Sequence, residues 1–280
     1  LKVSIALCLN LYINMSAINY IPAHEAVKNI KSGQRVFLHG SAATPIHIIH
    51  ALQHRYQELK DVELVSITSF GDVDFNDEKY RKSFFINSLF VSANTRQIAN
   101  SNYGDYVPIF LSQIPQLFKS NILPIDVAII HVSPPDVHGY CSLGTSVDIA
   151  RAAVEVAKYI IAQVNPNMPR THGDSFIHIN KIDSLVWHEA DLPEVNYEAG
   201  ATEVIKMIGK NIASLIDDGA TLQLGIGTIP DQVLKNLTTH KNLGLHTEML
   251  SDGVISLIKD GVINNSKKKI NKGKSVTSFM

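Results

Sequence analysis

The chain has 280 residues, of which 45% are hydrophobic and 18% charged, a balance that excludes an intrinsically disordered protein. Lysine plus arginine (25) nearly equals aspartate plus glutamate (26), so the excess of cationic side chains that nucleic-acid binding requires is missing. Two cysteines cannot form a disulfide framework, which favours a reducing compartment: the cytoplasm, or the mitochondrial matrix if the source is eukaryotic. At this length we expect about two domains.

The chain begins with an apolar stretch, Val3 to Ile13, which Ser4 and Asn10 interrupt. The stretch is too short to span a bilayer, so we expect no membrane association. No clear small-x-small cleavage site follows it, which favours a non-secretory extension or a misassigned start over a signal peptide. Met15 would then be the true start, and residues 1–14 an extension of the first domain.

Beyond this stretch, short apolar strands alternate with segments of helical period, which predicts an α/β fold with two similar, open, mostly parallel sheets. The run IDVAIIHV is apolar and bounded by prolines, as is typical of a buried parallel strand. The predicted strands span Arg35–His39, Val62–Thr68, Ile125–Val132 and Tyr159–Val164, and the predicted helices span Ile46–Leu59 and Glu198–Asp217.

The segment His188–Tyr197 is acidic, contains Pro193 and has little periodicity. Such a segment is typical of a domain boundary. We therefore expect an N-terminal domain over residues 1–190 and a second domain from residue 191 to 280.

Two segments on either side of this boundary resemble each other. IKSGQRVFLHGSAATPIHIIHAL (from Ile30) and IDDGATLQLGIGTIPDQVLKNL (from Ile216) share the order helix end, glycine turn, strand, small-residue loop, proline and helix. With one gap, Gly33 aligns with Gly219, Pro45 with Pro230, and Leu52 with Leu237; DVELVSI (from Asp61) then aligns with NLGLHTE (from Asn242). Any two βαβ units look alike, but the shared placement of the proline favours a duplication.

In the second copy, the loop Gly225-Ile226-Gly227 (the GIG loop) lies between a predicted strand, Thr221–Leu224, and a helix entered at Pro230. Glycines let backbone N–H groups approach a ligand, and a helix N-terminus favours an anion, so this loop is a candidate phosphate or oxyanion site. Pro230 replaces the third glycine of a dinucleotide fingerprint, which argues against an NAD-dependent oxidoreductase. A plain strand-to-helix turn is the other interpretation.

Glu248 follows the next predicted strand, which ends near His246. The carboxyl ends of neighbouring parallel strands share an edge, so we expect Glu248 beside the GIG loop. A carboxylate there can attack an activated acyl group, or it can simply be a solvated residue at a helix start. Ile67 holds the aligned position in the first copy, so Glu248 is not part of the shared scaffold. Ser251 or Asp252 is expected to cap the following helix.

The run QLGIGTIPDQVLKNLTTHKNLGLHTEMLSDGVISLIKDG, from Gln223 to Gly261, resembles the acetyl-CoA hydrolase/transferase family. This family of class I CoA-transferases includes 4-hydroxybutyrate and butyrate–acetate CoA-transferases. Further matching segments are AVKNIKSGQRVFLHGSAATP (from Ala26), DYVPIFLSQIP (from Asp105) and VSPPDVHGYCSLGTSVD (from Val132).

The resemblance implies that Glu248, in the HTE motif, is the nucleophile of a ping-pong CoA transfer from an acyl-CoA to a carboxylate such as acetate. A glutamyl–CoA thioester would be the intermediate. The residues that the resemblance places in contact with CoA are Gln223, Leu224, Gly225, Ile226 and Gly227. It also implies a homodimer or higher oligomer, and acyl-CoA as a substrate with no permanently bound cofactor.

Family members continue past KGKSVTSFM with a second glycine-rich loop. We therefore expect the second domain to be incomplete in this chain, and the chain alone to be poorly active. The sequence leaves three interpretations open: a CoA-transferase, an acetyl-CoA hydrolase, and a truncated, non-catalytic CoA-binding remnant.

Three histidines and one cysteine elsewhere in the chain are candidate reactive groups. His47, His50 and His54 are spaced i, i+3 and i+7, which does not bring them onto one ion, and no carboxylate accompanies them, so we expect no metal site. Cys141 lacks an identifiable base, so we expect it to pack or to line a pocket.

Two polar segments complete the set of candidates. Asp136 and His138, with Ser142 and Gly144, are candidates for the acyl pocket opposite Glu248, or for plain turn residues. Lys267-Lys268-Lys269 is too short for a nucleic-acid patch, and we expect a solvated loop.

Overall fold

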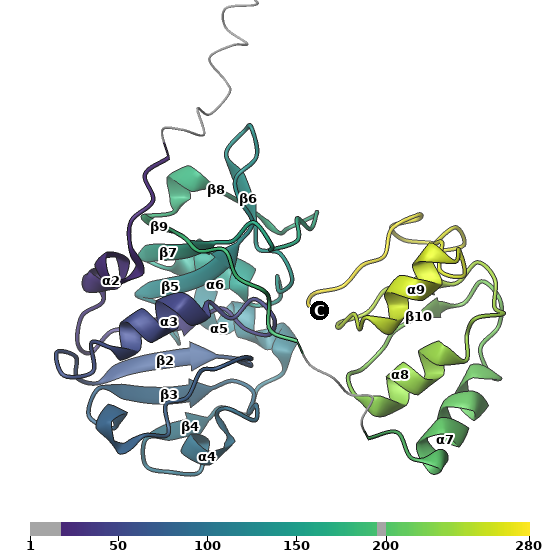
Figure 1. Cartoon of the computed structure of the whole chain (residues 1–280), viewed down its shortest axis with the longest axis horizontal. Coiled ribbons are helices and arrows are strands. Elements are labelled where there is room, and N and C mark those ends of the chain that lie inside the picture. The colour runs from purple at the N-terminus through teal and green to yellow at the C-terminus, as the bar shows by residue number, and fades with distance from the viewer. Residues whose placement is uncertain (1–17, 195–199) are drawn as a thin grey trace, which may run out of the picture. The chain divides into compact units, whose positions relative to one another are not determined.

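The computed structural model describes residues 18–194 and 200–280 (Figure 1). The predicted extension, residues 1–14, lies outside the described residues. The chain divides into two compact units, an N-terminal unit ending at Glu194 and a C-terminal unit from Val195 to Met280. The division falls inside the acidic segment that predicts a boundary.

A seven-stranded parallel sheet forms the centre of the N-terminal unit, in the order β4-β3-β2-β1-β5-β7-β9 (Figure 1). The chain runs outward from β1 on one side and from β5 on the other, so the unit is doubly wound and the predicted α/β fold is confirmed. The strands are β1 (Arg35–Leu38), β2 (Val62–Ser66), β3 (Phe84–Ser88), β4 (Gly104–Tyr106), β5 (Val127–Val132), β7 (Tyr159–Val164) and β9 (Ser184–Trp187), and a small antiparallel pair adds β6 (Tyr140–Ser142) and β8 (Phe176–His178).

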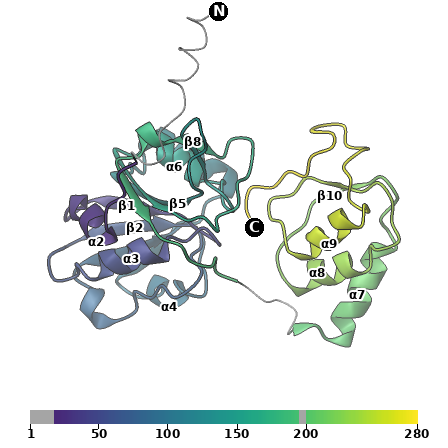
Figure 2. The same ribbon diagram turned by 45° about the horizontal axis from the view of Figure 1, so that its top comes forward.

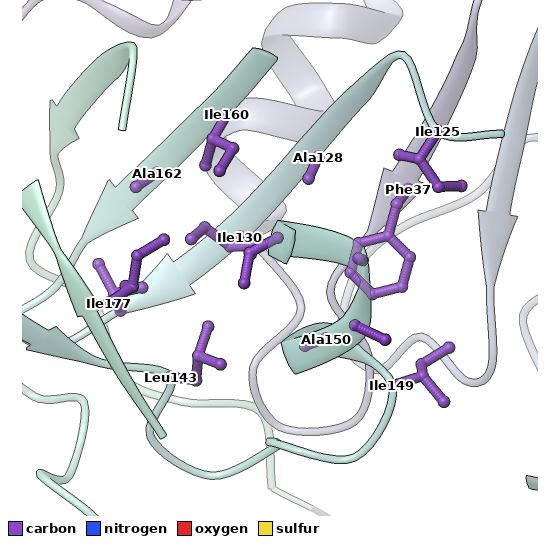
Figure 3. Packing of buried hydrophobic residues seen from close by; sticks show 14 of the residues in the cluster. Phe37, Ile125, Ala128, Ile130, Leu143, Ile149, Ala150, Ile160, Ala162 and Ile177 are labelled. Atoms are coloured by element: carbon purple, nitrogen blue, oxygen red, sulfur yellow. The ribbon is translucent and has the colours of Figure 1, made fainter. Parts of the chain in front are cut away.

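Helices cover both faces of this sheet because successive strand residues point to opposite faces. Val36 and Phe37, neighbours on β1, belong to two different buried clusters. One cluster packs α2, α3 and α4 on the sheet, and the other packs α5 and α6. Figure 3 shows part of the second cluster, including Ala150 of α6 and Ile130 of β5. The helices are α2 (Ala23–Ala26), α3 (Ile46–Gln53), α4 (Arg96–Ala99), α5 (Ile114–Lys119) and α6 (Ala150–Val156), with 3-10 turns at Val27–Asn29, Glu78–Tyr80, Leu111–Gln113 and Ile179–Lys181.

The predicted helix Ile46–Leu59 is shorter than expected, because α3 ends at Gln53. Beyond it the backbone continues as single turns, such as the one closed by the Arg55 N–H on the Leu52 carbonyl (3.0 Å). The Arg55 guanidinium donates to backbone carbonyls before β1, including that of Ile30 (2.9 Å). This tertiary contact, which periodicity does not reveal, holds the chain in its turns.

The C-terminal unit has a parallel pair, β10 (Thr221–Leu222) and β11 (Gly244–Leu245), with α7 (Glu203–Ala213), α8 (Thr228–Lys235) and α9 (Gly253–Lys259). Helix α7 packs along α8 (Figures 1 and 2). Gly209 allows this approach, because a Cβ there would lie 2.7 Å from that of Gln232. The predicted helix Glu198–Asp217 is observed only as α7, and Glu198 itself lies outside the described residues.

Matching glycine turns support the duplication inferred from the sequence. Gly33 and Gly219 both have left-handed backbones, with φ of 76° and 80°. The Gly33 N–H donates to the Lys60 carbonyl (2.9 Å), and the Gly219 N–H donates to the Lys241 carbonyl (2.8 Å). The two copies therefore enter their first strands through the same turn.

Strand register repeats as well. Arg35 lies opposite Glu63 in the first copy, and Thr221 lies opposite Gly244 in the second, which are the pairs that the sequence alignment predicts. Because a register shift of one residue would reverse the buried face, this agreement indicates two copies of one βαβ unit.

Candidate active site

The GIG loop connects β10 to α8, as predicted. Helix α8 begins at Thr228 with Gly227 at its N-cap, where φ is 114°, a conformation that favours glycine. Pro230 lies in the first turn, where a missing N–H costs little. Gly227 itself brings no side chain that could cap the helix.

The loop backbone is accessible. A Cβ built on Gly225 or on Gly227 would meet no atom within 4 Å among the described residues beyond the chain neighbours. Ile226, between them, is 53% exposed. A ligand can therefore approach the main chain of all three residues.

The corresponding loop of the first copy is closed. Its Ala43 N–H donates to the Gly40 carbonyl (3.1 Å), and its Thr44 N–H donates to the Ser41 carbonyl (3.1 Å). A Cβ on Gly40 would lie 2.7 Å from the Thr68 oxygen. Since these residues are buried, the two copies of one scaffold differ in that only the second presents an open loop.

Thr247 ties the HTE motif to the GIG loop. Its buried hydroxyl accepts from the Leu224 N–H (2.8 Å) and lies 2.9 Å from the Leu224 oxygen. Leu224 directly precedes Gly225, and Thr247 directly precedes Glu248. The structure therefore links the chain directly before Glu248 to the chain directly before the GIG loop, and the roles of Glu248 and the loop stay predictions.

Glu248 combines a fixed backbone with a free side chain. Its carbonyl oxygen accepts from the N–H groups of Ser278 (3.0 Å) and Phe279 (3.1 Å) and from the hydroxyls of Thr277 (3.0 Å) and Ser278 (2.7 Å). Its side chain is exposed, and no described residue forms an ion pair or hydrogen bond with its carboxylate. An unpaired carboxylate on a rigid backbone is suited to nucleophilic attack.

The five predicted CoA contacts are not equally accessible. Leu224 is only 8% exposed, packs in the core of the C-terminal unit, and uses both backbone polar groups on Thr247. The Gln223 side chain is exposed and donates to the Leu224 oxygen (3.2 Å). Of the five predicted CoA contacts, Gln223 and the GIG loop are thus the accessible ones.

The expected side-chain cap of α9 is wrong. Asp252 occupies the N-cap but has a helical backbone (φ −59°, ψ −27°), and its side chain makes no capping bond. The Ser251 hydroxyl is buried without a partner among the described residues. Instead, the Val254 N–H donates to the Ser251 carbonyl (3.1 Å).

The structure favours the turn interpretation of Asp136 and Ser142. The Asp136 carboxylate accepts from the His138 N–H (2.9 Å) and pairs with Arg170 (2.6 Å). The Ser142 hydroxyl accepts from the Thr171 N–H (3.1 Å). Both side chains fold the segment that follows β5.

The histidines and Cys141 make local contacts. The His47 ring stacks on His188 with centroids 3.9 Å apart, and the His50 Nε2 lies 2.7 Å from the Asp72 carbonyl. No three metal-ligating side chains gather in the part of the chain that the structure describes. Cys141 is fully buried, and burial raises its pKa to about 12, which confirms the expected packing role.

The predicted solvated loop at Lys267-Lys268-Lys269 is wrong for the middle lysine. Lys267 and Lys269 are exposed, but Lys268 is 5% exposed. Its Nζ donates to the carbonyls of Leu245 and Lys274, both at 2.7 Å. Neither periodicity nor charge pattern signals this burial.

Within residues 18–194 and 200–280, every helix is too short or too polar to cross a bilayer.

The N-terminal unit is an open, doubly wound α/β sheet. The C-terminal unit repeats its βαβ unit, and there the GIG loop and Glu248 follow the two parallel strands β10 and β11. A sequence profile of the acetyl-CoA hydrolase/transferase N-terminal domain matches residues 18–195. The chain belongs to the acetyl-CoA hydrolase/transferase family.

Its relatives are named CoA-transferases. The chain is 46% identical over 261 residues to 4-hydroxybutyrate coenzyme A transferase of Clostridium kluyveri, covering 93% of this chain and 60% of that protein. It is 46% identical over 254 residues to a succinyl-CoA:acetate/propanoyl-CoA:succinate CoA transferase of Fasciola hepatica, covering 90% and 52%.

Solved structures agree. The 4-hydroxybutyrate CoA-transferase of Porphyromonas gingivalis superposes with a TM-score of 0.78 at 35% identity, covering 93% of this chain and 62% of that one. RipA of Yersinia pestis superposes with a TM-score of 0.87 at 32% identity, covering 93% and 63%. This chain therefore spans between 52% and 63% of the length of these four relatives.

Proposed function

We propose that the protein moves CoA between an acyl-CoA and a short-chain carboxylate such as acetate, through a covalent intermediate on Glu248. One observation carries the proposal: the exposed carboxylate of Glu248 has no partner among the described residues and stands on a fixed backbone beside the open GIG loop. The family, whose relatives are named CoA-transferases, supplies the substrate class.

The reaction begins when a Glu248 carboxylate oxygen attacks the thioester carbonyl carbon. The C–S bond breaks and CoA leaves as a thiolate, giving an acyl–glutamyl anhydride. The thiolate then attacks the glutamyl carbonyl carbon, and the first acid leaves as a carboxylate with the bridging oxygen. A glutamyl–CoA thioester remains, so the free energy of the substrate's thioester bond is conserved on the enzyme.

A second carboxylate completes the cycle. It attacks the glutamyl thioester and expels the thiolate, forming a new anhydride. Attack of the thiolate on the new acyl carbonyl carbon releases the product acyl-CoA and regenerates the Glu248 carboxylate. Two half-reactions on one residue give ping-pong kinetics.

The GIG loop supplies backbone donors in this scheme. Negative charge develops on the carbonyl oxygen at each attack, and fixed N–H groups stabilise such an oxygen without reorganising. In other enzymes one such donor contributes about 3 kcal/mol to the transition state. Contacts to the rest of CoA, through the loop and Gln223, can add binding energy that favours the same step.

The proposal also covers the cofactor requirement, the oligomeric state and the cellular compartment of the enzyme. Every covalent step uses only Glu248 and the substrates, so no resident cofactor is required. By its resemblance to the family we also propose a homo-oligomer acting in the cytoplasm, which native mass and localisation measurements would test.

The decisive experiment is to trap the intermediate. After incubation with acetyl-CoA, mass spectrometry should find CoA attached to the peptide that carries Glu248. Borohydride, which reduces a thioester, should inactivate the protein only after this incubation. A protein that transfers CoA without any adduct at Glu248 would contradict the mechanism.

Variants test the same residue. Glu248→Gln should lower the transfer rate by about a thousandfold or more. Glu203→Gln, at an exposed glutamate on α7, is the matched control and should leave the rate unchanged. Release of free CoA in the absence of an acceptor acid would identify the hydrolase activity instead.

A further inference from the structure

The peptide of Leu245, three residues before Glu248, is held by side chains where the first copy uses a strand. Leu64, the aligned residue in the first copy, pairs with Ile86 of β3. In the second copy, the Leu245 N–H donates to the Asn265 side-chain oxygen (2.8 Å), and its carbonyl accepts from the Lys268 ammonium (2.7 Å). Asn265 and Lys268 thus replace part of a neighbouring strand.

Lys268 is an unusual choice for this position. It is 5% exposed, and among the described residues its ammonium donates to two neutral carbonyls, those of Leu245 and Lys274. Burial lowers the pKa of its amine. A buried cation without a counter-ion is costly, so a structure retains it only where its hydrogen bonds matter.

The surrounding sequence makes room for the lysine. A Cβ on Gly244 would lie 2.6 Å from the Lys268 Cγ, so only glycine lets the lysine stem cross β11. The Asn265 amide donates to the Ser275 hydroxyl (3.0 Å), and the Gly273 N–H donates to the Asn265 carbonyl (3.0 Å). Segment 264–275 is therefore closed around the Leu245 peptide.

This closed segment leads directly to the contacts that fix Glu248. Past Lys274, the Val276 N–H donates to the Leu245 carbonyl (3.2 Å), and the Val276 carbonyl accepts from the Thr247 N–H (2.9 Å). The next residues, 277–279, hold the Glu248 carbonyl. Lys268 thus joins both chain segments between which the Glu248 backbone is fixed.

We infer that Lys268, together with Asn265, is a positioning residue for Glu248: its ammonium joins β11 to segment 274–279 and so fixes the backbone from which the Glu248 carboxylate extends. The inference rests on the proposed function. Lys268 does not contact the substrate in this scheme. Its loss should therefore slow the chemical step and leave CoA binding unchanged.

The test uses Lys268→Met, which keeps the volume of the stem and removes the ammonium. Lys267→Met and Lys269→Met, at the exposed neighbours, are matched controls and should stay within about twofold of the unchanged protein. At a temperature where circular dichroism shows all variants folded, Lys268→Met should lower kcat by about 10- to 100-fold, because small displacements of reacting groups have effects of this size. The KM for acyl-CoA should change little.

A folded Lys268→Met variant with an unchanged kcat would overturn the inference. So would an equal rate of formation of the Glu248 adduct, since a purely structural lysine alters thermal unfolding but not this rate. Failure of the proposed function is distinguishable, because it would appear as the absence of any adduct in the unchanged protein.

Should Lys268→Met not fold, Asn265→Ala carries the test. It frees the Leu245 N–H and leaves the ammonium in place. A lowered kcat with an unchanged KM supports the inference, and an unchanged kcat overturns it.

Discussion

The Thr247 hydroxyl lies 2.8 Å from the backbone nitrogen of Leu224 and 2.9 Å from its oxygen. One side chain thereby satisfies both polar groups of the residue that precedes the GIG loop. Because Glu248 follows Thr247, the backbone position of Glu248 and the start of the GIG loop depend on the same hydroxyl.

Thr247→Val should therefore affect both stability and rate. The change leaves the buried Leu224 N–H without its partner, and we expect the free energy of unfolding to fall by about 1–3 kcal/mol. The transfer rate should fall as well, and Thr247→Ser, which keeps the hydroxyl, should restore most of it. Urea unfolding and steady-state kinetics measure the two effects. Thr239→Val, at an exposed threonine, is the control, and an unchanged rate in Thr247→Val would contradict this role.

The two glycines of the GIG loop should respond differently to alanine. Gly227 has a φ of 114°, so Gly227→Ala should lower the free energy of unfolding by about 1–2 kcal/mol. Gly225 has open space around it and no left-handed φ, so Gly225→Ala should leave unfolding nearly unchanged. Its methyl group would nevertheless stand where a ligand approaches, and kcat/KM should fall by about tenfold or more. Normal kinetics in Gly225→Ala would show that the loop is not a ligand contact.

His131 should make the fold sensitive to mild acid. Burial, with a smaller contribution from His39, lowers the pKa of His131 from 6.5 to about 3. Between these values the unfolded chain binds a proton that the folded chain does not, so stability falls as the pH is lowered through this window. The contribution of one such group is about 1.4 kcal/mol per pH unit.

Urea unfolding between pH 7 and pH 4 measures this dependence. His131→Asn should show a smaller loss of stability per pH unit than the unchanged protein. His54→Gln, at an exposed histidine, should retain the original slope. Equal slopes for His131→Asn and the unchanged protein would assign the acid sensitivity to other groups.

Much of the fold could be predicted because its signals are local. The apolar run within Ile125–Val132 forms β5, and Tyr159–Val164 forms β7 with the predicted bounds. The parallel pairing of the strands that precede the GIG loop and Glu248 could also be predicted, because the two copies align.

The remaining features depend on partners far away in the sequence. The burial of Lys268 comes from the carbonyl of Leu245, 23 positions away, and a triplet of lysines suggests solvation instead. The early end of α3 follows from the contacts of Arg55 with the segment before β1. The role of Thr247 depends on Leu224, which is 23 positions away, and its only local signal is a hydroxyl between a buried strand and an acidic residue.

The loop after β1 and the loop after β10 come from two copies of one βαβ unit, but the first supports the fold and the second is accessible to a ligand. In the first copy, N–H groups of the loop donate to carbonyl oxygens of the same loop, and these hydrogen bonds make the turn a rigid support for a large sheet. In the second copy, Gly225 and Gly227 leave the main chain of the turn accessible. A mutational survey of the two loops should therefore reveal opposite constraints: fold integrity governs tolerance after β1, and turnover governs it after β10.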